Sequence, residues 1–360
     1  MTQRITILGD GAMATVCSIL LTQRGHSVTI WGALEDSIEQ LLQTRENPQR
    51  LPGVRIPPSV RLTTNEDDCF AGCTMIVNAI PTQFMRGTWQ RVGHHIPPAV
   101  PIVSVTKGIE NHTLLRPTQI IADVLGGKKT LLHGTLCDHP LAVLSGPNIA
   151  AELARYLPAT SVAAADDPKL AQLVQATFSA EWFRVYTNAD LLGVELAGAT
   201  KNVIAIAAGI VDGLGAGSNA KAALVTRGLV EITRLAVAMG AREDTFSGLA
   251  GLGDLITTCF SPEGRNRHVG EQIGKGRTLE EVLSEMSSIA EGVPTTRAVH
   301  ELSRRHQIEM PITAAVHAVL FQNKDVIAAL TELMSRDPKP EHTPTPGPPD
   351  HPAQNPSASP

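Results

Sequence analysis

The first residues whose spacing suits chemistry are two glycines near the start of the chain. Gly9-Asp10-Gly11-Ala12-Met13-Ala14 fits G-x-G-x-x-A, directly after a strand-like run and at the start of a helical one. Gly9 permits a tight turn, Gly11 lets the backbone approach a pyrophosphate, and Ala14 lets the helix pack closely on the strand. The helix dipole and amides then face the phosphates. The motif predicts dinucleotide binding by Gly9, Gly11, Ala12, Met13 and Ala14; the alternative is a glycine turn in a generic α/β protein.

The charges after the second strand-like run bear on the choice between NAD and NADP. Glu35 and Asp36 lie about two dozen residues past Gly11, slightly beyond the usual position of the acid that binds the ribose hydroxyls. No Arg or Lys occurs between residues 27 and 36, which favours NAD. Arg45 and Arg50 can still reach a 2′-phosphate, so both NAD and NADP remain open.

A possible metal cluster consists of His133, Cys137 and His139. A fourth ligand and an accompanying CxxC are missing, so we expect solvated loop residues and no metal site. The chain has five cysteines and no basic segment followed by a long apolar one at its start. An odd, sparse set of cysteines without a secretory signal predicts reduced thiols in the cytoplasm.

Short, continuous apolar runs with helical segments between many of them dominate the first half of the chain. Such runs are typical of strands that are buried on both faces of a parallel sheet. The alternation predicts βαβ units and an α/β domain of Rossmann type over residues 1–188. The expected strands are Ile5–Leu8, Ser27–Trp31, Met75–Ala79, Pro101–Val105, Leu141–Leu144, Thr160–Ala164 and Phe183–Tyr186.

Helical patterns replace the strand-like runs after about residue 188, which predicts an all-α domain over residues 189–336. Thr278 and Glu281 fit a capping box. The longest uncharged apolar run, Val203 to Val211, is too short to span a membrane, so no membrane span is expected. The expected helices are Leu191–Asp212, Asn219–Met239, Arg267–Ile273, Leu279–Met286, Thr295–Arg305 and Thr313–Gln322.

The overall composition limits the possible partners. A net charge of −5 and 12 aromatic residues in 360 provide neither the basic face nor the stacking platforms of a nucleic-acid binder. Nine of the 24 residues in 337–360 are Pro, and the only apolar side chains there are two Ala. This segment cannot bury enough surface to fold, so we expect a disordered tail.

A series of longer motifs is specific to one family. The chain resembles the bacterial NAD(P)-dependent glycerol-3-phosphate dehydrogenases from about residue 3 to residue 335. The resemblance implies reversible hydride transfer between NAD(P)H and C2 of dihydroxyacetone phosphate, which supplies sn-glycerol 3-phosphate for glycerophospholipid synthesis. It also implies a homodimer formed through the helical domain. The motifs are RLPGVRIPP at 50–58, VNAIPTQFMR at 77–86, SVTKGIE at 104–110, SGPNIAAE at 145–152, ELAGATKNVIAIAAGI at 195–210, NAKAALVTRGLVE at 219–231, GLGDLITTC at 251–259, RNRHVG at 265–270 and AEGVPTT at 290–296.

The same resemblance assigns the site residues. It makes Lys201 the catalytic lysine, with Lys107 and Asp254 beside it. The implied substrate site consists of Lys107, Gly146, Asn148, Lys201, Asn202, Asp254, Thr258, Gly264, Arg265 and Asn266. Beyond the glycine turn, the implied cofactor contacts are Lys107, Ala150, Arg265, Ile289 and Glu291.

The residues themselves support these roles but leave alternatives. Lys201 lies among apolar neighbours, and desolvation lowers a lysine pKa and makes it a better acid near neutral pH. Without the resemblance, such a lysine can also extend from a core helix to solvent. Asp254 can be a helix N-cap, and Arg265 with Arg267 can be a solvated charge run.

The chain departs from the family pattern at several positions. Asn148 replaces Ser or Thr, and Gly264 replaces a Ser whose hydroxyl contact to substrate is then lost. Ala33 stands where an Arg is common, which weakens the case for NADP. Met13 replaces an aromatic residue and Ala14 a glycine. The remaining alternatives are another two-domain reductase of β-hydroxyacid or ketopantoate type and a non-catalytic nucleotide-sensing homologue.

Overall fold

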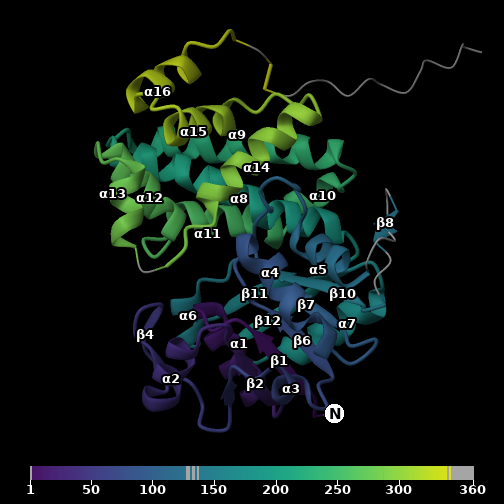
Figure 1. Cartoon of the computed structure of the whole chain (residues 1–360). Coiled ribbons are helices and arrows are strands. Elements are labelled where there is room, and N and C mark those ends of the chain that lie inside the picture. The colour runs from purple at the N-terminus through teal and green to yellow at the C-terminus, as the bar shows by residue number, and fades with distance from the viewer. Residues whose placement is uncertain are drawn as a thin grey trace, which may run out of the picture.

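The chain folds into an α/β part followed by a helical part, and the two stack on each other (Figure 1). The computed structural model describes residues 2–126, 130–131, 134–135, 138–286, 288–338 and 340–341. The expected fold class, a Rossmann-type domain followed by an all-α domain, is confirmed. Residues 342–360 of the expected proline-rich tail lie outside the described residues.

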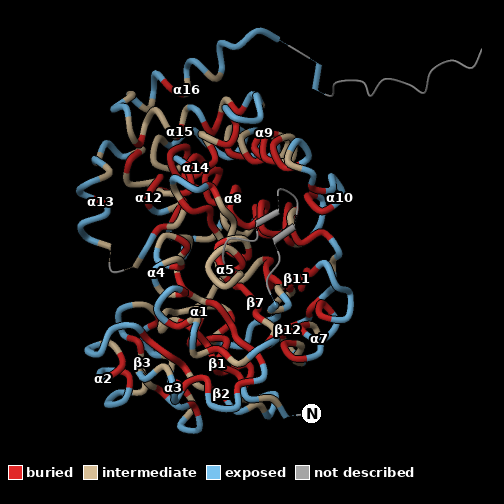
Figure 2. The backbone as a smooth tube through the Cα atoms, turned by 45° about the vertical axis from the view of Figure 1, so that its right-hand side comes forward, coloured by how far each residue is buried: buried red, intermediate tan, exposed pale blue. Residues whose placement is uncertain are grey.

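One eight-stranded sheet forms the centre of the α/β part, in the order β12-β11-β10-β7-β6-β1-β2-β5. All seven expected strands are present; the central strands β6, β7 and β10 are almost wholly buried, whereas β12 at the sheet edge alternates buried with exposed residues (Figure 2). The sheet is parallel except where β11 runs antiparallel to β10. The strands are β1 (Arg4–Leu8), β2 (Ser27–Trp31), β5 (Arg61–Thr63), β6 (Met75–Asn78), β7 (Ile102–Ser104), β10 (Leu141–Ser145), β11 (Ala159–Ala165) and β12 (Phe183–Asn188).

Helices and two small hairpins complete this part. One hairpin, β3 (Glu46–Asn47) with β4 (Leu51–Arg55), was not expected from the apolar pattern because its strands are short and mostly polar. The other pairs β8 (Thr130–Leu131) with β9 (Gly134–Thr135). The helices are α1 (Ala12–Gln23), α2 (Glu35–Thr44), α3 (Glu66–Phe70), α4 (Thr82–Val92), α5 (Pro117–Gly126), α6 (Ala150–Ala154) and α7 (Pro168–Phe178), with a 3₁₀ turn η1 (Gly93–His95).

The six expected helices of the second part are present, with further short ones between them. The capping box is confirmed: the Thr278 hydroxyl accepts from the Glu281 amide at 3.3 Å, and Glu281 accepts from the Thr278 amide at 2.9 Å. The elements are α8 (Leu191–Gly213), α9 (Gly217–Ala238), α10 (Glu243–Phe246), the π-helical turn η2 (Leu249–Gly253), α11 (Asp254–Phe260), α12 (Arg265–Gly274), α13 (Leu279–Glu285), α14 (Gly292–Arg305), α15 (Pro311–Phe321) and α16 (Val326–Met334).

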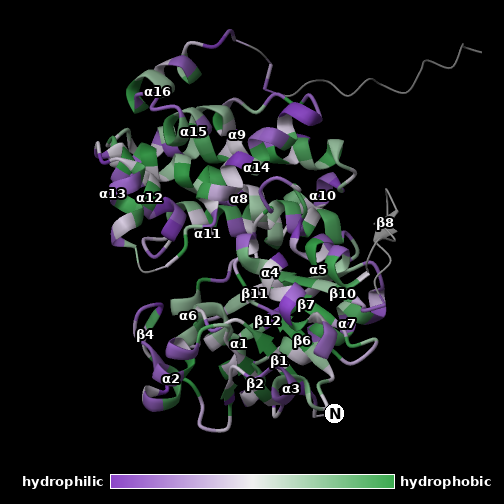
Figure 3. Ribbon diagram, in the orientation of Figure 1, coloured by the Kyte–Doolittle hydropathy of each residue, from purple (hydrophilic) through white to green (hydrophobic). Residues whose placement is uncertain are grey.

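The long helix α8 is the core of the helical part and is largely hydrophobic (Figure 3). With 23 residues, the helix is long and apolar enough to cross a membrane. This length exceeds that of the uncharged run Val203–Val211, from which no membrane span was expected. In the protein, 94% of its most apolar window is buried. Such burial is typical of the core helix of a folded domain.

Helices α8 and α12 approach each other through glycines. A Cβ on Gly209 would lie 2.0 Å from the Arg267 carbonyl oxygen, and one on Gly270 would lie 2.0 Å from the Ile206 carbonyl oxygen. Gly213 and Gly274 extend the same contact one turn further along. The missing side chains let two backbones touch, which fixes the start of α12 relative to the middle of α8.

Gly270→Ala tests this contact. The added methyl group meets a backbone carbonyl that cannot move away, so we expect the variant to lose about 1–3 kcal/mol of unfolding free energy. Urea unfolding followed by circular dichroism measures the loss. Gly87→Ala in α4 is the matched control, because a Cβ there meets nothing within 4 Å and alanine favours a helix. Equal stability of the two variants would show that the helices do not need the glycine contact.

Candidate active site

The carboxylate of Asp254 joins two lysines from different parts of the chain. Lys107 Nζ lies 2.6 Å from Asp254 Oδ2, and Lys201 Nζ lies 2.8 Å from Asp254 Oδ1. Lys107 follows β7 at the carboxyl edge of the sheet, Lys201 is in α8, and Asp254 begins α11. The side chains of Lys201 and Asp254 are 7% and 2% exposed. The three residues that the sequence resemblance makes catalytic therefore form one buried cluster.

The π-helical turn η2 delivers Asp254 to this cluster. A Cβ on Gly251 would lie 2.3 Å from the Phe246 carbonyl oxygen, so the turn closes only with glycine there. The cap residue of α11 is Gly253, and Asp254 is in the first turn. The alternative of Asp254 as an N-cap is therefore wrong, since its carboxylate faces the two lysines and not the helix amides. Turns of this type are often found at functional sites.

Burial gives Lys201 an unusual acidity. Desolvation lowers its pKa to about 8; the negative charge of Asp254 opposes this shift, and the positive charge of Lys107 adds to it. Lys201 also donates a hydrogen bond to the Thr258 hydroxyl, which in turn donates to Asp254 Oδ1 at 3.2 Å. The ammonium group thus ends in a polar cluster, and the alternative that it merely extends to solvent is wrong.

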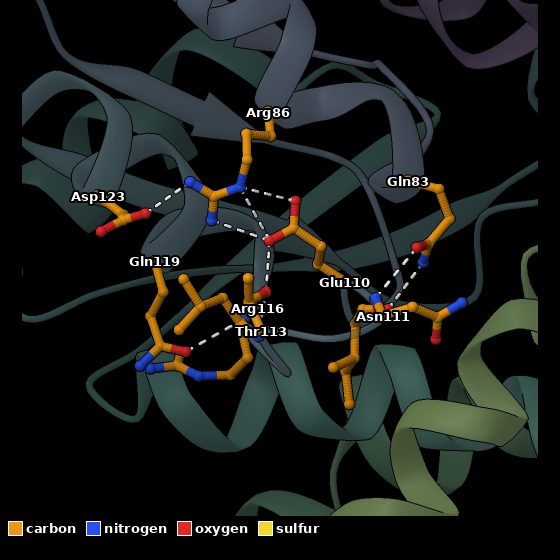
Figure 4. A network of polar contacts seen from close by, with 10 residues as sticks. Gln83, Arg86, Glu110, Asn111, Thr113, Arg116, Gln119 and Asp123 are labelled. Atoms are coloured by element: carbon orange, nitrogen blue, oxygen red, sulfur yellow. Dashed lines mark hydrogen bonds and ion pairs between the residues drawn. The ribbon is translucent and has the colours of Figure 1, made fainter.

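The loop that carries Lys107 is held by the polar network of Figure 4. Arg86 in α4 donates to Glu110 Oε2 at 2.9 Å and to Asp123 of α5 at 2.6 Å. Gln83 also binds this loop, because its Nε2 donates a hydrogen bond to the Ile109 oxygen at 2.8 Å. These contacts attach the loop to α4 and α5 on one side of Lys107.

A second carboxylate ties the far end of this loop to α8. Glu195 accepts from the Thr118 amide at 2.9 Å and from the Thr118 hydroxyl at 2.7 Å, and it pairs with Arg116. Its carboxylate is fully buried. Because Glu195 and Lys201 are in the same helix, the contact fixes the Lys107 loop relative to Lys201. Neither Glu110 nor Glu195 was predicted; their partners lie too far along the sequence for a local pattern to reveal them.

Residues after β10 line one side of the cluster. Lys107 Nζ donates to the Gly146 oxygen at 2.8 Å, and Asn202 Nδ2 lies 3.4 Å from the Lys107 oxygen. Asn148 Nδ2 donates to the Ser161 hydroxyl at 2.7 Å, and among the described residues its Oδ1 finds no partner. Asn148 and Lys107 also line a cavity together with Met13 of the glycine turn. The predicted substrate and cofactor residues are adjacent here.

The start of α12 forms the other side. Gly264 is the cap residue of this helix, and Arg265 Nη1 donates to the Ile289 oxygen at 2.9 Å. Asn266 Oδ1 accepts from the Gly292 amide at 2.9 Å. The Arg265 side chain is open to solvent, yet the surrounding protein desolvates it enough to lower its pKa. It is therefore accessible to an anion from solution.

Two neighbours of Arg265 behave differently from it. Arg267 is not part of a solvated charge run, because its Nε lies 2.7 Å from Asp212 Oδ2. Glu291 accepts from the Thr82 amide at 3.0 Å, and burial raises the pKa of its carboxyl to about 7. Thr82 and the nearby Arg265 limit this rise. Near neutral pH, Glu291 can therefore donate or accept a hydrogen bond.

The glycine turn fits a dinucleotide. Gly9 has a φ of 110°, and a Cβ there would lie 2.9 Å from the Ala79 oxygen. Among the described residues no side chain caps the start of α1, so the amides of Ala12 and Met13 can bind an anion. Helix α6, with Ala150 at its start, packs on α1. The turn thus has the close backbone geometry of a dinucleotide motif, and the cofactor contacts of its residues stay a prediction.

The sequence analysis considered His133, Cys137 and His139 as metal ligands and expects no metal site there. His133 and Cys137 lie outside the described residues. His139 Nδ1 lies 3.0 Å from the Val100 oxygen. The expected absence of a metal site stays a prediction.

Comparisons with known proteins agree over most of the chain. The family profile of the NAD-dependent glycerol-3-phosphate dehydrogenase N-terminus matches residues 4–171, and that of the C-terminus matches residues 190–331. A glycerol-3-phosphate dehydrogenase [NAD(P)+] of Salinibacter ruber is 47% identical over 342 residues, which cover 95% of this chain and 97% of the relative. The enzyme of that name from Prosthecochloris aestuarii is 45% identical over 337 residues, 94% of this chain and 99% of the relative.

A solved structure has the same fold throughout. The crystal structure of glycerol-3-phosphate dehydrogenase from Coxiella burnetii superposes with a TM-score of 0.87 at 34% identity. The match covers 93% of this chain and 99% of the other. The similarity therefore includes both the sheet and the helices around Lys201.

Arg86→Met tests whether the network of Figure 4 holds the Lys107 loop. Removing the guanidinium leaves Glu110 buried without its ionic partner, so we expect amide hydrogen exchange over residues 106–115 to accelerate at least about tenfold. Mass spectrometry of peptic fragments measures the exchange. Arg91→Met is the matched control on the same helix, because Arg91 pairs with Glu66, away from the loop. Unchanged exchange in Arg86→Met would mean that other contacts hold the loop.

Proposed function

The chain belongs to the NAD-dependent glycerol-3-phosphate dehydrogenase family, and we propose that Lys201 is the proton donor of its reaction. The protein is an NAD(P)-dependent glycerol-3-phosphate dehydrogenase that interconverts dihydroxyacetone phosphate and sn-glycerol 3-phosphate. The relatives that match almost the whole chain are named glycerol-3-phosphate dehydrogenases. This agrees with the main interpretation and not with a ketopantoate-type reductase or a nucleotide sensor without activity. The observation that supports the proposal for Lys201 is its buried contact with Asp254.

The reduction places negative charge on the C2 oxygen of the substrate, and that oxygen needs a proton. The bound nicotinamide, when reduced, supplies the hydride. With a pKa of about 8, Lys201 is mostly protonated at pH 7 and yields its proton more readily than an ordinary lysine. Asp254 and Thr258 orient the ammonium group through the hydrogen bonds described above. In the reverse direction the neutral amine accepts the proton.

Lys107 provides the second positive charge at the same oxygen. Two ammonium groups share one carboxylate, so the cluster keeps a net positive charge when both lysines are protonated. A fixed positive charge in a site of low water content stabilises a developing alkoxide. Lys107 thus polarises the carbonyl, and Lys201 transfers the proton. The negative charge of Asp254 offsets the electrostatic repulsion between the two ammonium groups.

The substrate phosphate is bound at the start of α12. Arg265 offers a planar, solvent-accessible guanidinium, and Asn266 follows it. Gly264 contributes a backbone amide at most, since the hydroxyl of the usual Ser is absent. Gly146, Asn148, Asn202 and Thr258 complete the substrate side through their contacts with Lys107, Ser161 and Lys201.

The glycine turn and the residues around it would hold the cofactor. Gly9, Gly11 and the amides at the start of α1 hold the pyrophosphate, and Ala14 lets α1 pack against β1. The remaining contacts come from Lys107, Ala150, Arg265, Ile289 and Glu291. Glu291 meets a polar group of the cofactor, and its pKa of about 7 permits either direction of hydrogen bonding.

The cellular setting is also part of the proposal. The protein acts in the cytoplasm, where four buried cysteines remain free thiols: Cys17, Cys69, Cys73 and Cys259. It supplies glycerol 3-phosphate for phospholipid synthesis and forms a homodimer through the helical domain, without a membrane span. The domain boundary lies between β12 and α8, so residues 1–188 bind the cofactor and 189–336 complete the site.

The pH dependence of the two directions tests Lys201. Reduction needs the protonated ammonium, so its kcat falls as the pH rises through about 8, whereas the kcat of glycerol 3-phosphate oxidation rises over the same interval. Lys201→Met lowers kcat at least about 100-fold and removes both dependences. Lys221→Met is the control. Lys221 is also a buried lysine, and after its removal its partner Asp212 still has an ion pair with Arg267. Turnover of Lys201→Met near that of the wild type would exclude Lys201 as the proton donor.

A second steady-state experiment tests Arg265. Losing a hydrogen bond to a charged group costs about 1.5–3 kcal/mol, so Arg265→Ala raises the KM for dihydroxyacetone phosphate at least about tenfold. Arg265→Lys keeps the charge without the fork and gives an intermediate KM. If the KM for the cofactor rises and that for the phosphate substrate does not, Arg265 serves the cofactor alone.

A further inference from the structure

The residue between the two glycines of the turn, Asp10, carries a carboxylate with two partners. Its Oδ1 lies 2.7 Å from Arg50 Nη1, and its Oδ2 accepts a hydrogen bond from the Ser37 hydroxyl. Asn47 Nδ2 donates to the Asp10 backbone oxygen at 2.7 Å and so fixes the hairpin that carries Arg50. The carboxylate is therefore held in place from α2 and from the β3–β4 hairpin.

This carboxylate lies beside the end of β2. The Gly9 amide donates to the Trp31 oxygen at 2.9 Å, and the Asp10 Cβ lies 3.4 Å from the position of a Cβ on Gly32. In dinucleotide-binding folds, an acidic side chain at the end of this strand accepts from the hydroxyls of the adenosine ribose. Glu35 and Asp36, which follow β2, are exposed in the first turn of α2. Asp10 brings a carboxylate to this end of the cofactor site from the glycine turn instead.

Arg50 lies beside the glycine turn but is not a free cation. Its Nη1 lies 4.0 Å from the position of a Cβ on Gly11, and its charge helps to lower the pKa of Arg265. Its side chain is one-third exposed and paired with Asp10. Two other arginines nearby are engaged as well: Arg45 with the Val60 oxygen at 2.8 Å, and Arg91 with Glu66 at 2.6 Å.

We propose that the Asp10–Arg50 ion pair makes the protein select NAD(H) over NADP(H), an inference that rests on the proposed position of the dinucleotide on the glycine turn. A ribose hydroxyl can donate a hydrogen bond to the Asp10 carboxylate. A 2′-phosphate instead brings further negative charge to that carboxylate, and the arginine that would bind it is already neutralised. Ala33, where a family member often has an arginine, supplies no replacement charge.

Binding of two cofactor fragments isolates this end of the site. ADP-ribose and its 2′-phosphorylated form both lack the nicotinamide ring, and isothermal titration calorimetry gives the Kd of each. The wild-type protein binds ADP-ribose at least about tenfold more tightly. Asp10→Asn keeps the shape, removes the charge and releases Arg50, so the ratio of the two Kd values changes at least about tenfold in favour of the phosphorylated fragment.

Removal of Arg50 provides an independent test in the same binding experiment. Arg50→Met leaves the carboxylate unneutralised, so binding of the phosphorylated fragment weakens more than binding of ADP-ribose. The double variant Asp10→Asn with Arg50→Met loses the gain that Asp10→Asn alone produces. Arg45→Met, another arginine of this region, leaves the ratio at its wild-type value.

Two results would overturn the inference: equal affinity of the wild type for the two fragments, or a ratio that Asp10→Asn and Arg50→Met both leave unchanged. Reduction of dihydroxyacetone phosphate with NADH is measured on the same variants as a separate readout. Wild-type protein that discriminates the fragments without reducing the substrate would contradict the proposed function and not the selection by Asp10.

Discussion

The contact on which the site depends is the sharing of one buried carboxylate by two ammonium groups. Asp254 offers one oxygen to Lys107 and the other to Lys201, and each of these groups would be costly to bury alone. Lys107 belongs to the sheet domain, whereas Lys201 and Asp254 belong to the helical domain. The interaction that assembles the three proposed catalytic groups therefore also joins the α/β part to the helical part, and neither part contains all three groups by itself.

Four structural features support this contact. The network around Glu110 attaches the Lys107 loop to α4 and α5, and Glu195 attaches the end of that loop to α8. The π-helical turn places Asp254, and the glycines of α8 and α12 hold the start of α12 against α8. The charges are thus fixed before substrate arrives, which is what electrostatic stabilisation of a transition state requires.

The sequence predicted those features that depend on neighbouring residues. Continuous apolar runs revealed the seven main strands, the glycine spacing revealed the cofactor turn, and the apolar neighbours of Lys201 indicated its burial. The resemblance to the family supplied the site residues. Features that depend on distant partners were not predictable: the antiparallel β11 and the pairing of Asp10 with Arg50. The local pattern also left Asp254 open as a helix N-cap, whereas the cap residue is Gly253. Periodicity carries no information about which chain segment closes a turn or neutralises a charge.

The glycine contact between α8 and α12 also orders events while the chain is being made. Helix α8 leaves the ribosome first, and the face that α12 covers stays open until Gly274 has been synthesised. During that interval an apolar helix of 23 residues stands without its partner, with the length and composition of a segment that can enter a bilayer. Exposed apolar surface of this kind promotes aggregation and engages chaperones. Synthesis of α12 closes this interval, because only its glycines let a backbone reach the open face of α8.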